Sequence, residues 1–135
     1  MLAGITLLIF LALATPLAHA RDVSARCYLD SHWQTESVAA WTADMVRRVA
    51  DVRHTVTKPA ELAQLRAILR LDRFQPRVPQ QDDFCFVVDI RHADGTIESY
   101  CAGRFYVMSA DYHRGLRIDR TAFRRDVDRF MEVAR

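Results

Sequence analysis

The chain has 135 residues, of which 50% are hydrophobic and 27% charged, and its formal net charge at pH 7 is +2. This length suits one domain with a modest core. The small net charge argues against a nucleic-acid partner, and the sequence has no repeats, low-complexity tracts or long Gly/Ser linker. We therefore expect a single compact domain.

The first twenty residues, MLAGITLLIFLALATPLAHA, predict a cleavable secretory signal peptide over 1–20. They contain no charged side chain, although such leaders usually begin with Lys or Arg, and Ala18 and Ala20 are small residues where a signal peptidase cuts. The apolar run from Ile5 to Ala14 is short for a bilayer span of about 20 residues. It favours cleavage before Arg21 over an uncleaved anchor. The mature domain, 21–135, is then expected in the periplasm or secreted, without stable membrane insertion.

The segment RDVSARCYLD (21–30) follows the leader and alternates Val23, Ala25, Cys27 and Leu29. Alternation of apolar residues with polar ones is typical of a strand that has one buried face. We expect an edge strand or an ordered arm here.

Two helices are expected next. Val38, Trp41, Met45, Val49 and Val52 recur at spacings of three and four, which predicts an amphipathic helix over 36–54. Pro59 begins a second predicted helix over 59–72, which has an apolar stripe from Leu62 to Leu69. Because the join is short, the two helices are expected to form an antiparallel hairpin.

The stretch FCFVVDIRHADGTIESYCAGRF (84–105) predicts a β-hairpin after an exposed loop over 75–83. The even positions from Phe84 to Ile90 are apolar and are expected to face the core. A three-residue turn at 93–95 would place Val87 opposite Cys101, whereas a two-residue turn at 94–95 would place Val88 there. Both registers remain open, and Gly103 could add a bulge that shifts either one.

Three cysteines, Cys27, Cys85 and Cys101, lie in the predicted mature domain. An oxidising compartment favours one disulfide and one free thiol. The hairpin brings Cys85 and Cys101 closest, so we predict that pair, with Cys27 joined to either strand cysteine as the alternative. No C-x-x-C motif or second cysteine pair indicates redox or zinc chemistry.

The last third of the chain predicts more strand and one helix. The second hairpin strand is expected to run to about Met108, a turn to span 109–115, and a short strand to follow over 116–118. Asp119 or Thr121 then caps a helix to about Ala134, with Phe123 and Val127 in its buried stripe. The predicted architecture is α+β: an antiparallel two-helix hairpin, a small antiparallel sheet of 2–4 strands and a C-terminal amphipathic helix.

Catalytic and metal-binding patterns are weak in this sequence. His32, His54, His92 and His113 lack metal-ligand spacing, and we expect each at the surface. One acidic pair, Asp82 and Asp83, supplies too few ligands for calcium. No catalytic residue, metal or cofactor is therefore predicted. The side chains best suited to binding are Tyr112, His113 and Arg114 in one turn, together with Trp33, because these types are common at interaction hot spots.

These observations favour a small exported, non-enzymatic protein that binds another envelope or secreted protein. A toxin, a lytic enzyme or a secretion subunit would be the partner, and the protein would act as an inhibitor or immunity protein. This expectation rests only on an analogy with such proteins in size and predicted export. Two alternatives remain: an accessory subunit of a secretion or conjugation apparatus, and a small-molecule-binding or hydrolase-like domain with a cleft between helices and sheet.

Overall fold

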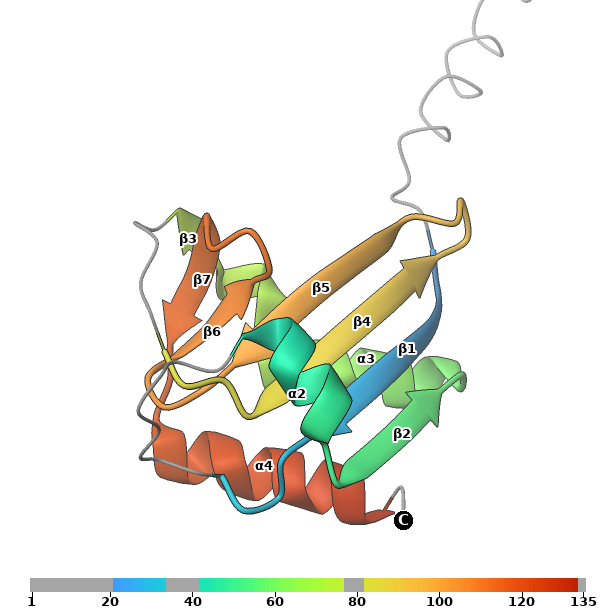
Figure 1. The fold of residues 1–135 in the computed structure, drawn as a ribbon. Helices are drawn as coiled ribbons and strands as arrows, with labels where there is room; N and C mark the ends of the chain where they lie inside the picture. Colours follow the sequence, from blue (N-terminus) through green and yellow to red (C-terminus); the bar gives the residue numbers. More distant parts are fainter. Residues whose placement is uncertain (1–20, 34–41, 77–81, 134–135) are drawn as a thin grey trace, which may run out of the picture.

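A computed structural model describes residues 21–33, 42–76 and 82–133, which form one seven-stranded antiparallel sheet with three α-helices around it (Figure 1). The strand order is β2-β1-β4-β5-β6-β7-β3. In chain order the elements are β1 (Asp22–Leu29), α2 (Ala43–Val49), β2 (Val52–Val56), α3 (Pro59–Leu69), the 3₁₀ turn η1 (Leu71–Arg73), β3 (Gln75–Pro76), β4 (Phe86–His92), β5 (Ile97–Ala102), β6 (Tyr106–Ser109), β7 (Arg114–Arg117) and α4 (Arg120–Val133).

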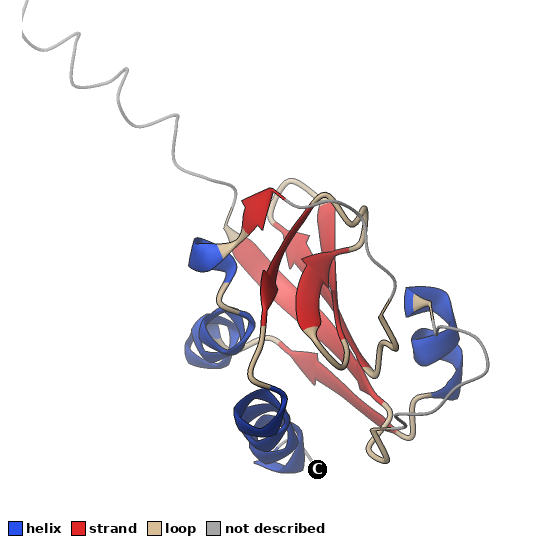
Figure 2. Ribbon diagram, turned by 90° about the vertical axis from the view of Figure 1, so that its left-hand side faces the viewer, coloured by secondary structure: helices blue, strands red, loops and turns tan. Residues whose placement is uncertain are grey.

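Helices lie on both sides of the sheet, with α3 and α4 on one side and the shorter α2 on the other (Figures 1 and 2). The larger core lies under α3 and α4 and includes Leu29, Phe86 and Val127. The smaller core lies under α2 and includes Val46, Val87 and Met108. Within the described residues, no helix is long and apolar enough to cross a membrane. The predicted signal peptide, 1–20, lies outside those residues.

Strand β4 is buried on both faces, because each face has its own core. Phe86, Val88 and Ile90 pack in the larger core, as their even positions predict, while Val87 packs in the smaller one. The three-residue turn is the correct one of the two alternatives. Val87 pairs with Cys101, and the backbone N–H of His92 donates to the carbonyl of Thr96 at 2.9 Å.

The predicted helix over 36–54 and the antiparallel helical hairpin are wrong. In the described part of this range, α2 covers only Ala43–Val49, and Ala50 has the extended ψ of 127° that ends it. The chain then forms β2, which pairs with β1 through Cys27 and His54. Val49 and Val52 continue the helical spacing, but Val52, Thr55 and Val56 are β-branched residues that suit a strand. Residues 36–41 lie outside the described part.

The predicted sheet of 2–4 strands is also wrong, because seven strands form it. The segment expected at an edge, β1, lies between β2 and β4. The strand expected to run to Met108 is divided into β5 and β6. At the division, a Cβ added to Gly103 would lie 2.5 Å from the carbonyl oxygen of Asp83, so only glycine fits this close approach.

The other two helices lie close to the predicted positions. Helix α3 begins at Pro59 but ends at Leu69, since Arg70 takes a left-handed conformation with φ of 53° before η1. Helix α4 begins at Arg120, and the Oδ1 atom of Asp119 accepts the backbone N–H of Ala122 at 3.1 Å. Its predicted stripe is buried.

Candidate functional site

A polar cleft of about 670 Å³ lies between α3 and one end of the sheet. Strands β1, β4, β5 and β7, helix α3 and the β4–β5 turn all contribute to it. We call it the polar cleft, and it is lined by Asp22, Arg66, Leu71, His92, Asp94, Thr96, Glu98, Tyr100 and Arg114. Its volume falls within the range of about 300–1,000 Å³ typical of ligand sites, but charged groups dominate the lining where such sites are usually apolar.

Asp22 is the centre of the charged floor of the cleft. Arg66 of α3 donates to both of its carboxylate oxygens, through Nε and through Nη2, the latter at 2.8 Å. The Arg66 guanidinium holds the pKa of Asp22 below its usual value, against the opposing effect of burial. A bidentate arginine–carboxylate pair is strong and directional. It fastens α3 to the beginning of β1.

His92 lies between two carboxylates and is only 8% exposed. Its Nδ1 lies 3.0 Å from Oδ1 of Asp22, and its Nε2 lies 3.1 Å from Oε1 of Glu98. Neither contact has the geometry of a hydrogen bond. Among the described residues, neither ring nitrogen therefore has a hydrogen-bond partner. An imidazole can donate from both nitrogens only when it is protonated.

Glu98 and Tyr100 form the β5 wall of the cleft. The Tyr100 hydroxyl donates to Oε2 of Glu98 at 2.5 Å, and the Tyr100 ring packs edge-on against Phe74 at 5.7 Å between centroids. Burial, reinforced by the Glu98 carboxylate, raises the pKa of Tyr100. The phenol therefore stays protonated and acts as a donor.

Arg114 stands at the rim of the cleft as the first residue of β7. Its backbone N–H donates to the Ser109 hydroxyl at 3.2 Å, and that hydroxyl donates in turn to Oδ1 of Asp111. Pairing with Pro76 of β3 holds it from the other side. Among the described residues, no carboxylate forms an ion pair with its guanidinium.

The four predicted binding residues do not form one surface. Tyr112 stacks on Phe84 at 5.9 Å in the smaller core, His113 is exposed at the turn, and Arg114 reaches the cleft. Trp33 is 3% exposed and donates from Nε1 to Oδ1 of Asp128 at 2.9 Å. Trp33 is therefore a core residue.

His92 also differs from the expectation that every histidine lies at the surface. It lies on the side of β4 that faces α3, one residue beyond the last predicted strand position. The cleft was missed because its side chains come from segments far apart in the sequence. The alternation in β5, which places Glu98 and Tyr100 on one face, is the signal that could have suggested part of it.

All three cysteines are buried, and none of them forms a disulfide in the structure. Cys101 packs with Val87 in the smaller core, whereas Cys85 and Cys27 belong to the larger one. Cys85 and Cys101 thus lie on opposite sides of the sheet in the structure, and the Cys85–Cys101 disulfide stays a prediction. Burial raises the pKa of each thiol to about 12, which disfavours the nucleophilic thiolate.

Asp82 precedes β4, and its side chain binds the turn that joins β5 to β6. Its carboxylate accepts the backbone N–H groups of Asp83, Arg104, Phe105 and Tyr106 at 2.9–3.0 Å. The side chain is buried at 5% exposure. These four bonds occupy the carboxylate and explain its burial without a cation.

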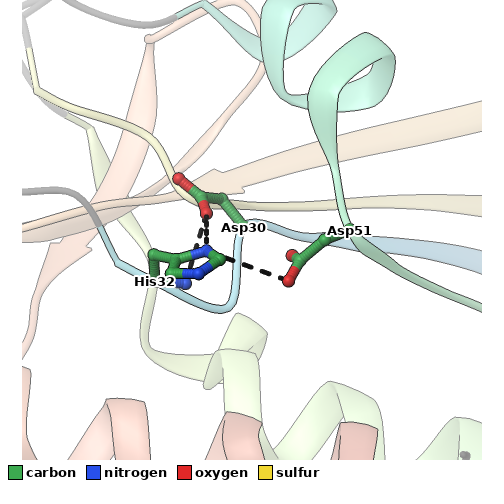
Figure 3. Close-up of side chains that lie close together, drawn as sticks. All are labelled: Asp30, His32 and Asp51. Atoms are coloured by element: carbon green, nitrogen blue, oxygen red, sulfur yellow. Dashed lines mark hydrogen bonds and ion pairs between the residues drawn. The ribbon is translucent and has the colours of Figure 1, made fainter.

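One group among the described residues has the arrangement of a cation site (Figure 3). Ligand atoms of Asp30, His32 and Asp51 lie within 4.8 Å of one another. The Asp51 carboxylate already accepts the backbone N–H and the hydroxyl of Ser31, and the His32 side chain is 73% exposed. Two carboxylates and an imidazole could hold a divalent cation, but His32 and Asp51 are both exposed to solvent.

A second hollow, of about 640 Å³, runs along α4 and is lined by Arg120, Thr121, Arg124, Arg125, Asp128, Arg129 and Glu132. All seven side chains come from one helix. Arg124 pairs with Asp128 at 3.6 Å, as expected for residues four apart. The hollow is a furrow between solvated side chains, and it brings no separate segments together.

Comparisons with protein-family models, with curated proteins and with solved structures found no match to this chain. The geometry of the described residues is therefore the basis of the functional argument.

Proposed function

We propose that the protein is a small exported, non-enzymatic protein that binds another protein in the cell envelope or periplasm, as inhibitors and toxin-immunity proteins do. The predicted signal peptide supports the location. The polar cleft carries the proposal of binding, because it is a concave surface with fixed charges that converge from separate segments.

The chemistry of the cleft favours binding over catalysis. A general base needs a nitrogen or oxygen directed at the substrate, but both nitrogens of His92 face carboxylates. A cysteine nucleophile needs a lowered pKa, and the three thiols have raised values. The paired charges of the cleft instead form a rigid wall against which a partner could dock.

Affinity purification of the tagged protein from the envelope of its native host tests this proposal. We expect one near-stoichiometric partner, identified by mass spectrometry, that is retained by the Arg117→Glu protein and lost by the Arg114→Glu protein. Arg117 lies on the same strand and is exposed, but it does not line the cleft. Equal retention by both variants would place binding elsewhere, and absence of any partner would contradict the proposal.

A second function is binding of a small polar molecule, which the cleft volume of about 670 Å³ favours. A thermal-shift screen of the purified protein distinguishes the two. A compound that raises the Tm of the wild type but not of the Arg114→Glu protein would support this second function.

A further inference from the structure

The two arginines that line the polar cleft differ in their ion pairs. Arg66 is bound by Asp22, and the Glu98 carboxylate accepts the Tyr100 hydroxyl and lies beside His92. Asp94, at the β4–β5 turn, accepts both the backbone N–H and the hydroxyl of Thr96. Of the two arginines, Arg114 is the one that has no ion pair with a carboxylate among the described residues.

Arg114 is also held in place. Its backbone is bound by Ser109 on one side and by β3 on the other. The next residue, Gly115, is buried where an added Cβ would lie 2.7 Å from the carbonyl oxygen of Val107, so β7 packs closely on β6. A guanidinium on a fixed strand loses little backbone freedom on binding, and its planar fork suits a carboxylate.

The interior of the cleft adds a second observation that points to a ligand. His92 is buried, lines the cleft and has no well-directed hydrogen bond from either nitrogen among the described residues. Glu98, which covers Nε2, is 48% exposed. Because both nitrogens face carboxylates, the imidazole can donate to a ligand only when Glu98 rotates away from Nε2 towards solvent. The carboxylates of Glu98 and Asp94 repel a carboxylate ligand in the cleft. The hydrogen-bond donors that these two side chains already bind reduce that repulsion.

We propose that the polar cleft binds a carboxylate of the protein partner, with the Arg114 guanidinium as its main contact and His92 as a donor inside the cleft. This inference rests on the proposed function, because it assigns the chemistry of the partner at the same site. An aspartate or glutamate side chain, or a C-terminal carboxylate, would provide the group.

The test uses N-acetyl-aspartate amide as the probe, followed by NMR signals of the purified protein. Saturable shifts are expected at Arg114, His92 and Tyr100. The Arg114→Gln protein should bind about tenfold more weakly, as loss of one charge-assisted pair implies, and the Arg117→Gln protein should bind like the wild type. N-acetyl-asparagine amide, which has the same shape without the charge, should bind as weakly to the wild type as the acid does to Arg114→Gln.

Equal binding of the acid and the amide, or equal losses in the two arginine variants, would overturn the inference. Preferential binding of N-acetyl-lysine amide would overturn it as well and would indicate a cationic ligand. The proposed function can be refuted independently of this inference. A partner retained by the Arg114→Gln protein would refute the carboxylate contact and leave protein binding standing, whereas specific probe binding without any envelope partner would refute protein binding alone.

Discussion

The Nδ1 atom of His92 lies 3.0 Å from Oδ1 of Asp22 and so joins the last residue of β4 to the first residue of β1. Asp22 also binds Arg66 of α3 through both oxygens. One carboxylate thus connects two central strands and a helix at the end of the sheet where the polar cleft lies. Its charge state should affect both stability and cleft geometry.

Asp22→Asn should lower the free energy of unfolding by about 1 kcal/mol at neutral pH, a modest value because the Arg66 side chain is 36% exposed and the pair is screened by solvent. The folded pKa of Asp22 is lowered. Its contribution is therefore complete above the unfolded value of about 3.9 and is lost as the pH falls through the lower folded value. Urea unfolding from neutral pH into the acid range measures the difference between the two proteins.

The exposed Asp72 on η1 supplies the control for this pH series. Asp72→Asn should unfold like the wild type at every pH. If the deficit of Asp22→Asn did not shrink in acid, ionisation of Asp22 would not be the source of the stability.

Asp82→Ala should destabilise the fold by about 3 kcal/mol, because it removes the acceptor of four backbone N–H groups that the buried carboxylate binds. The carboxylate of the adjacent Asp83 forms no hydrogen bond or ion pair among the described residues, so Asp83→Asn should change stability by less than about 0.5 kcal/mol. Chemical denaturation of both proteins checks this. Similar losses would show that net charge in this segment, and not the four bonds, is responsible.

Gly103→Ala should cost about 3 kcal/mol, since its Cβ would meet the Asp83 carbonyl oxygen at 2.5 Å and backbone atoms cannot move aside cheaply. Gly95→Ala has free space but a φ of +88°, so it should cost about 1 kcal/mol through backbone strain alone. Urea midpoints of the two proteins compare a steric effect with a conformational one. An equal cost would contradict the close approach at Gly103.

The segments that the sequence predicted well are those whose pattern is decided locally. Pro59 at the beginning of α3, the Phe123–Met131 stripe of α4 and the alternation of Phe86, Val88 and Ile90 are all in their expected places. Each depends on neighbours within one helix or strand. The failures depend on long-range pairing: Val52–Val56 continues a helical spacing, but pairing with β1 makes it a strand.

The polar cleft was beyond sequence reasoning for the same reason. Asp22, Arg66 and His92 are separated by more than twenty residues each, and none of them belongs to a recognisable motif. Only Arg114 was singled out, and that choice came from its residue type. The sheet order β1-β4-β5 and the position of α3 bring these side chains together.

The three cysteines provide the last prediction. Because burial raises the pKa of each thiol to about 12, the native protein should react with a disulfide reagent such as DTNB far more slowly than an exposed thiol with a pKa of about 8.5. In denaturant, three equivalents of thiol per chain would mean that no disulfide forms, as in the structure, where Cys85 and Cys101 pack in different cores. A single equivalent would establish a disulfide, and peptide mapping would identify the pair. A Cys85–Cys101 bond would require Cys85 to leave the larger core, whereas a Cys27–Cys85 bond would stay within it.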